Sequence, residues 1–266
     1  MEPILLGDAA WSEDWANRLG KAACQILVDD ENAVLHGYRE VLKDAPGLVR
    51  TPTYACNRAF LGQYDMEERI EAVTNIAVDS GRQALDALKQ DTLLCGVIGP
   101  MPEGFDFEVD DLPRYAGDIA VYLIDKGVDC IQIEGFSWYP AFQKTVETVR
   151  RVNSAPIPMS AFYKCDQDLD VETYEQTWTL ATNLNLDLLG FELSLEQALK
   201  FPDRLGADLP MGFAINSLSG FDEAKQIAAL TVLIECDPSL ILGGQGLSSE
   251  DWRSTKTLIE QIQAKR

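Results

Sequence analysis

The chain has 266 residues, of which 43 are acidic and 22 are basic, so its formal net charge is −21. This charge would repel nucleic acid and anionic membrane surfaces, and we expect neither as a partner. With 46% hydrophobic residues, the chain has the composition of a folded protein. The first residues carry no export signal and no apolar stretch approaches the roughly 20 residues that span a bilayer, so we expect a soluble, cytoplasmic protein.

Short apolar runs alternate along the chain with longer stretches of helical periodicity. The predicted strands are Ile4–Asp8, Leu48–Tyr54, Thr92–Gly99, Cys130–Phe136, Ile157–Tyr163, Leu188–Leu193, Met211–Ser217 and Leu240–Gly244. The predicted helices are Glu31–Lys43, Met66–Lys89, Leu112–Lys126, Pro140–Asn153, Val171–Asn183, Leu195–Phe201, Gly220–Glu235 and Ser249–Ala264. Eight strand–helix units with right-handed crossovers close most economically into a barrel. The sequence therefore predicts an α/β fold, a single (β/α)8 TIM barrel that forms one domain over residues 1–266.

A doubly wound open sheet is the alternative fold. It would favour a GxGxxG turn after the first strand, and this chain has Gly7-Asp8-Ala9-Ala10-Trp11 there. The six cysteines are spread singly, which favours reduced thiols over disulfides or a zinc ribbon. A single histidine, His36, argues against a His-rich metal site.

The carboxyl ends of the strands form the rim at which TIM barrels carry out their chemistry. Asp8 ends the first predicted strand and Glu134 lies near the end of the fourth. Two carboxylates facing a cavity with no matching Lys or Arg would bind the ammonium group of a ligand; alternatively, each caps the segment that follows it. Aromatic residues near the rim could hold a cationic methyl donor, although packing is the alternative for each. They are Trp11, Tyr54, Phe136, Trp138, Tyr139, Phe162 and Tyr163.

Six segments spread over nearly the whole chain share their order and spacing with the motifs of one protein family. They are Gly7-Asp8-Ala9-Ala10 (GDGG in the family), Glu31–Glu40 (its first barrel helix), Arg50–Arg58 (TNTYxAN), Ile98-Gly99-Pro100, Lys126–Phe136 (AGVDLIxxET) and Leu242–Ser249 (GGCCGTT). On these segments the chain resembles the homocysteine S-methyltransferase family, which includes betaine–homocysteine methyltransferases. The resemblance implies a TIM barrel and methyl-transfer chemistry.

Family members hold a zinc ion with three cysteines, one from a GxNC segment after strand six and two from the GGCC segment. The zinc turns the homocysteine thiol into a thiolate, which is the nucleophile. This chain has Leu193 in the first cysteine position, and Gln245 and Gly246 in the other two. We therefore expect no zinc and no other cofactor. Cys56 and Cys165 lie near the predicted rim, but cysteines on separate loops rarely rebuild such a site.

The resemblance also indicates where a ligand would bind. Asp8 and Glu134 match positions that hold the substrate's ammonium group in the family, and Asn216 matches the asparagine of its PN segment. The candidate substrate-binding residues are Asp8, Thr53, Tyr54, Glu134, Phe136, Glu192, Asn216 and Gln245. No catalytic residue is assigned.

Three functions are compatible with these features. The first is zinc-independent methyl transfer involving an amino acid, a methylated amine or a sulfonium compound at the rim. Without zinc, a thiol of pKa near 8.5 would be only a few per cent ionised at pH 7, which disfavours homocysteine as the acceptor. The second is a non-catalytic barrel that binds such a ligand. The third is a methyltransferase component that works with a separate corrinoid protein. A homo-oligomer is also compatible with the sequence.

Overall fold

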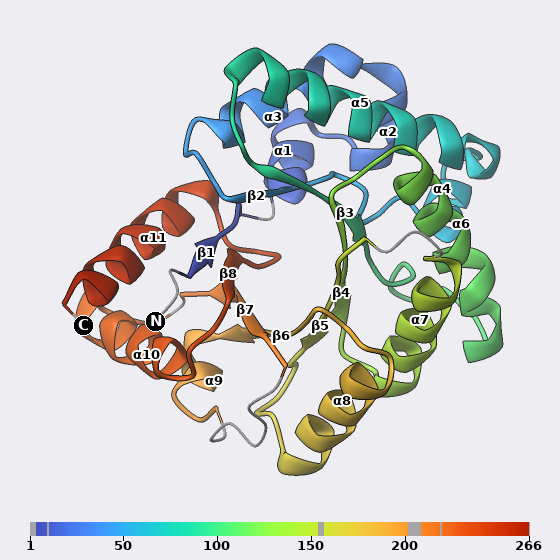
Figure 1. Ribbon diagram of the computed structural model, residues 1–266. Coiled ribbons are helices and arrows are strands. Elements are labelled where there is room, and N and C mark those ends of the chain that lie inside the picture. Colours follow the sequence, from blue (N-terminus) through green and yellow to red (C-terminus); the bar gives the residue numbers. More distant parts are fainter. Residues whose placement is uncertain (1–3, 10, 154–156, 202–208, 219, 266) are drawn as a thin grey trace.

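Eight parallel strands form the centre of the molecule. The computed structural model describes residues 4–9, 11–153, 157–201, 209–218 and 220–265. In chain order the strands are β1 Leu5–Leu6, β2 Leu48–Arg50, β3 Leu93–Ile98, β4 Cys130–Phe136, β5 Met159–Lys164, β6 Leu188–Ser194, β7 Met211–Ser217 and β8 Leu240–Gly243. Their order in the sheet is β1-β8-β7-β6-β5-β4-β3-β2. A parallel bridge between Gly7 and Leu48 brings β1 to β2, which confirms the predicted (β/α)8 barrel (Figure 1).

Helices surround the strands in the ring that this fold requires (Figure 1). They are α1 Trp11–Leu19, α2 Ala23–Asp29, α3 Glu31–Leu42, α4 Arg58–Gly62, α5 Ile70–Leu88, α6 Leu112–Asp125, α7 Tyr139–Val152, α8 Val171–Asn183, α9 Leu195–Ala198, α10 Glu223–Glu235 and α11 Ser249–Ala264. Every predicted helix is present. The seventh predicted helix begins later than expected because Asp222 caps α10, accepting a hydrogen bond from the Lys225 N–H. No helix of the described residues is long and apolar enough to cross a membrane.

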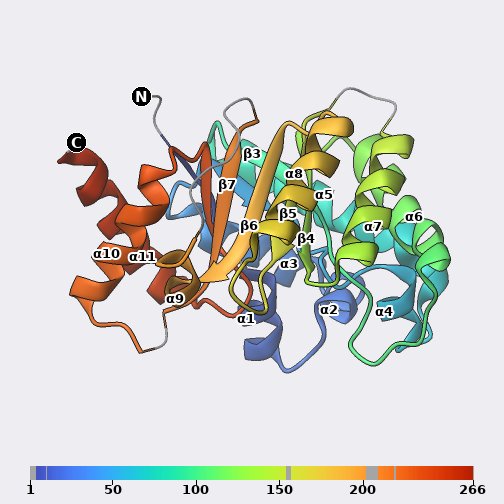
Figure 2. The ribbon, with the colours of Figure 1, turned by 90° about the horizontal axis from the view of Figure 1, so that it is seen from below.

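Three helices that periodicity did not predict, α1, α2 and α4, lie at the carboxyl end of the barrel (Figure 2). α1 buries Trp11 and Trp15, which lie four residues apart on one helix face. The Trp11 indole Nε1 donates to the backbone oxygen of Arg50 at 3.0 Å. This contact fixes the start of α1 against the end of β2.

The second strand is shorter than predicted because two threonine side chains take the place of its backbone. The Val97 N–H on β3 donates to Thr51 Oγ1 at 3.0 Å, and Thr53 Oγ1 donates to the Val97 oxygen at 2.7 Å. These hydroxyl groups continue the pairing with β3 beyond the backbone hydrogen bond from the Thr51 N–H to the Cys95 oxygen, which is 2.8 Å long. Thr53, a predicted site residue, therefore holds the loop that follows β2.

The inside of the barrel is filled by side chains. The Phe162 ring of β5 is fully buried in a cluster with residues such as Leu188, Ala214 and Leu242. A Cβ atom on Gly190 would overlap this ring, so the glycine makes room for it. The polar residues Arg50 and Glu192 follow Leu48 and Leu188 on their strands, towards the carboxyl end. An apolar plug therefore lies beneath a polar layer at the barrel mouth.

Candidate functional site

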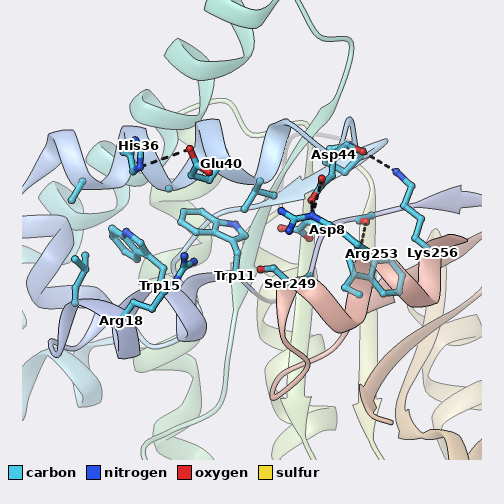
Figure 3. Close-up of a pocket in the computed structure, with 18 residues that line it drawn as sticks. Asp8, Trp11, Trp15, Arg18, His36, Glu40, Asp44, Ser249, Arg253 and Lys256 are labelled. Carbon is cyan, nitrogen blue, oxygen red and sulfur yellow. Dashed lines mark hydrogen bonds and ion pairs between the residues drawn. The ribbon is translucent and has the colours of Figure 1, made fainter. Parts of the chain in front are cut away.

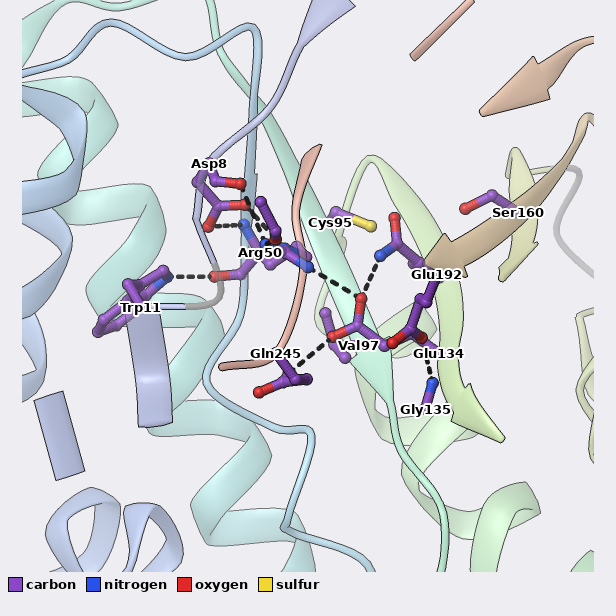
Figure 4. Close-up of polar contacts among 12 residues, drawn as sticks. Asp8, Trp11, Arg50, Cys95, Val97, Glu134, Gly135, Ser160, Glu192 and Gln245 are labelled. Atoms are coloured by element: carbon purple, nitrogen blue, oxygen red, sulfur yellow. Dashed lines mark hydrogen bonds and ion pairs between the residues drawn. The ribbon is translucent and has the colours of Figure 1, made fainter. Parts of the chain in front are cut away.

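Arg50 is the centre of the polar layer at the mouth (Figure 4). Its Nε lies 2.8 Å from Asp8 Oδ1, and its Nη1 lies 3.0 Å from Glu134 Oε2. Its Nη2 donates to the backbone oxygens of Asp8, at 3.1 Å, and Gly243. None of these three charged residues is more than 3% exposed. One guanidinium thus joins β2, β4, β8 and the end of β1.

From the sequence, no Lys or Arg was expected to pair with the carboxylates of Asp8 and Glu134. This expectation was wrong, because Arg50 pairs with both. Burial alone would lower the pKa of Arg50, but the carboxylates of Asp8 and Glu134 outweigh this effect and raise it, so the guanidinium stays charged. Burial raises the pKa of Asp8, and the charge and hydrogen bonds of Arg50 oppose the rise. The sequence contained one sign of this partner of the two carboxylates, an arginine directly after the apolar residues Leu48 and Val49.

Glu134 has two further partners besides Arg50. Gln132 Nε2 donates to Glu134 Oε2, and Gln245 Nε2 donates to Oε1 at 3.2 Å. Gln245 lies on the loop after β8, where the family has a zinc-binding cysteine. The side chain in that position therefore contacts the carboxylate of β4 directly.

Glu192 of β6 is also buried, but no residue that the structure describes forms an ion pair with it. Its Oε1 accepts the backbone N–H of Gly135, which has a φ of +86°. The pairing of β4 with β5 shifts register between Ile133 and Phe136, so this N–H is available to Glu192. Within the part of the chain that the structure describes, Glu192 Oε2 has no hydrogen-bond partner.

The surroundings of Glu192 favour its protonated form. Burial and the neighbouring charge of Glu134 raise the pKa of Glu192 to about 8. The Gly135 N–H, Arg50 and Lys164 oppose this rise without cancelling it. A carboxyl group with such a pKa can both give and take a proton near neutral pH.

A cavity of about 430 Å³ lies at the rim of the barrel. Lys164, Ser194 and Asn216 are among the residues that line it, at the ends of β5, β6 and β7. Lys164 is the register partner of Glu192, but Glu192 itself is buried and does not line this cavity. Asn216, predicted from the resemblance, contributes to this cavity and not to the ion-pair cluster.

The remaining predicted residues lie at different depths. Tyr54 is half-buried against Gly99 and Gly135, where a Cβ atom would overlap it. Phe136 belongs to the large hydrophobic core that the helices share, with 3% exposure. Asp8, Glu134, Glu192 and Gln245 are thus the predicted residues that the structure brings together at the mouth.

Three of the aromatic residues that the sequence places near the rim have different surroundings. Trp11 packs against Trp15 and Tyr38, with ring centroids 5.5 and 4.9 Å apart. Phe162 fills the barrel interior, whereas Trp138 is 52% exposed. Packing explains the buried members of this set.

The residues at the family's zinc positions do not fit the ion. Leu193 is apolar and buried, the Gln245 amide is bound to Glu134, and Gly246 has a φ of +87°, which a cysteine rarely adopts. Among the described residues, no three His, Cys, Asp or Glu side chains are grouped so that they could hold a metal ion. Burial raises the pKa of the Cys165 thiol to about 12 and that of Cys56 well above its usual value, so both stay protonated.

A second cavity, of about 390 Å³, lies between α3 and α11 and has Asp8 of the ion-pair cluster among its lining residues (Figure 3). Trp15, Glu40 and Arg253 are among its lining residues. One end is closed by Asp44, which accepts from Arg253 Nε at 2.8 Å and whose backbone oxygen accepts from Lys256 Nζ. Its charged groups therefore largely pair with one another.

Comparisons with known proteins agree with this geometry. The family model for homocysteine S-methyltransferase matches residues 6–219. Two structures of the homocysteine methyltransferase MmuM from Escherichia coli are similar, in the oxidised form (18% identity, 96% of this chain, 95% of that chain, TM-score 0.75) and the metallated form (17%, 96%, 96%, 0.74).

The carboxyl transferase domain of Rhizobium etli pyruvate carboxylase is less similar, with 10% identity and a TM-score of 0.56 over 99% of this chain and 48% of that chain. At these identities the similar structures establish the fold alone. No curated protein sequence matches the chain. Because the family model spans most of the 266 residues, the protein belongs to the homocysteine S-methyltransferase family.

Proposed function

We propose that the barrel mouth binds a small ligand through its cationic group and that methyl transfer at this site proceeds without zinc. The ligand would be an amino acid, a methylated amine or a sulfonium compound. The observation that carries the proposal is the imbalance of charge at the mouth. Three buried carboxyl groups, those of Asp8, Glu134 and Glu192, surround the single guanidinium of Arg50.

The imbalance makes a cation a suitable ligand. With Glu192 protonated, two carboxylates against one guanidinium leave one negative charge in a buried place, where an uncompensated charge is unfavourable. A ligand cation compensates this charge.

Zinc independence is supported by the side chains in the three zinc positions. Leu193, Gln245 and Gly246 offer no thiolate, and Gln245 is already engaged with Glu134. The same loss also favours a second function, a barrel that binds the ligand without catalysis.

Calorimetric titration with L-homocysteine, L-methionine, betaine and S-methylmethionine tests the binding proposal. We expect at least one of them to bind, and Glu134→Gln to weaken it at least tenfold because the charge excess is lost. Glu260→Gln, an exposed acid on α11, is the control of equal charge change and should leave binding intact. Equal affinity of both variants and the unaltered protein would exclude a charge-driven site.

Metal analysis and a methyl-transfer assay separate the remaining possibilities. Stoichiometric zinc in protein purified without chelator would contradict zinc independence. Transfer of a methyl group from betaine or S-methylmethionine to homocysteine, in metal-free protein, would establish the enzyme. Binding without transfer would establish the non-catalytic barrel.

A further inference from the structure

Glu192 differs from the other two carboxyl groups of the mouth. Both oxygens of Asp8 and both oxygens of Glu134 accept hydrogen bonds from Arg50 or from side-chain amides. Glu192 accepts at Oε1 alone, from the Gly135 N–H, while its Oε2 is buried and lacks a donor in the described part of the chain. One oxygen is thus anchored by the backbone, and the other accepts no hydrogen bond from the described residues.

The charged groups around Glu192 come from three strands. Glu134 of β4 disfavours its ionisation, whereas Arg50 of β2 and Lys164 of β5 favour it. Cys165, next along from Lys164, has a thiol that stays protonated beside it. On its other side, the register partner on β7 is Ala214, which does not titrate. Among the described residues, therefore, no ion pair with Glu192 explains its burial.

We propose that Glu192 Oε2 is the catalytic base that removes the proton of the methyl acceptor, in place of activation by a metal. This inference rests on the proposed methyl-transfer function. Three observations support it: the unpartnered oxygen, its anchoring through Gly135, and its place at the barrel mouth beside Glu134.

The step balances with a thiol acceptor and a methylsulfonium donor. The ionised Glu192 takes the S–H proton, which leaves a lone pair on the acceptor sulfur. This lone pair forms the new S–CH3 bond as the donor's S–CH3 bond breaks, and the bonding electrons stay on the donor sulfur, which becomes a neutral thioether. Glu192 then returns its proton to solvent.

Keeping the proton on Glu192 matters because of the charge at the mouth. If the proton went to solvent instead, the thiolate would add a negative charge next to Glu134, which disfavours its formation. Transfer to Glu192 leaves the net charge of the mouth unchanged. The carboxyl group also becomes a hydrogen-bond donor to the new thiolate.

The test compares the unaltered protein with Glu192→Gln, which keeps the side-chain shape and an acceptor for Gly135. Methyl transfer from S-methylmethionine to L-homocysteine is measured from pH 6 to pH 10, with the thermal midpoint as a check on folding. We expect kcat of the variant to fall about 100-fold at pH 7 with little change in KM, as is typical for loss of a general base. The deficit should shrink above about pH 9, where the thiol ionises without help.

Two further measurements keep the inference open to refutation. Infrared titration should show a protonated carboxyl band that disappears near pH 8 and is absent from the variant. Glu192→Asp, which keeps a carboxyl group, should recover part of kcat and the pH dependence. Equal kcat of the unaltered protein and Glu192→Gln at every pH would overturn this inference alone. Absence of any transfer by the unaltered protein would overturn both it and the methyl-transfer function.

Discussion

Arg50 on β2 reaches across β3 to Glu134 on β4, with Nη1 3.0 Å from Oε2, while its Nε pairs with Asp8. Replacing Arg50 by Met leaves two buried carboxylates without their cation. We expect Arg50→Met to lower the free energy of unfolding by about 3–5 kcal/mol, measured by urea denaturation. Arg253→Met, which removes an ion pair with Asp44 at a half-exposed side chain, is the control and should lower it by about 1 kcal/mol or less. Similar losses for both would show that the buried pairs contribute little.

The protonation of Glu192 predicts a dependence of stability on pH. The pKa of Glu192 is about 8 in the folded protein and near 4.5 in an unfolded chain, so between these values the folded state binds the extra proton. The contribution of Glu192 to the free energy of unfolding is therefore fully present below pH 4.5. It falls by about 1.4 kcal/mol for each pH unit as the pH rises from 4.5 to 8.

Glu192→Gln removes this titration. We expect the variant to gain stability relative to the unaltered protein between pH 5.5 and pH 8.5, as measured by urea denaturation at both values. A difference between the two proteins that does not change with pH would mean that Glu192 titrates with an ordinary pKa.

The backbone of Gly135 is expected to tolerate no side chain. Its φ is +86°, and a Cβ atom would overlap the Tyr54 hydroxyl. Gly127 has a φ of +85° with nothing within 4 Å of such an atom, so Gly127→Ala measures the backbone strain alone, about 1–2 kcal/mol. Gly135→Ala should lower the free energy of unfolding by clearly more than Gly127→Ala. Equal losses would show that Tyr54 moves aside freely.

The packing of Phe162 against Gly190 predicts a coupling inside the barrel. Gly190→Ala should destabilise the protein by about 1–3 kcal/mol because the new methyl group overlaps the ring. In the background Phe162→Leu the same change should cost less, which a double-mutant cycle of unfolding free energies measures. Gly117→Ala on α6, where the nearest atom is 3.6 Å away, should have the opposite sign and stabilise the protein. Additive effects of Gly190→Ala and Phe162→Leu would contradict direct contact.

The strands and helices of the barrel could be predicted because periodicity and turn residues are local. β4 and β7 have the predicted bounds, Cys130–Phe136 and Met211–Ser217. The predicted end of β2 was wrong because the hydroxyl groups of Thr51 and Thr53 make the last hydrogen bonds to β3. Their partner is Val97, more than 40 residues along the chain, so the sequence around β2 does not reveal these bonds. α1 and α2 are short, and packing against the barrel stabilises them more than their own sequence does.

The site was only partly predictable for a similar reason. Asp8 and Glu134 stand at strand ends, and the rule for barrel rims identifies them. The burial of Arg50 depends on partners 42 and 84 residues away, so its strand alone does not distinguish it from an exposed strand end. The free oxygen of Glu192 depends on the backbone of Gly135, which no pattern in β6 reveals.

The Arg50 guanidinium binds the Gly243 oxygen, and Gln245 binds Glu134, so the charged cluster draws on both ends of the chain. During synthesis, Arg50 leaves the ribosome long before these late residues do. The nascent barrel must therefore keep a cation and two carboxylates hydrated until its last strand arrives. Closure of the cylinder and desolvation of the mouth then become a single late event, so a chain truncated before β8 should not form a dry, native-like site.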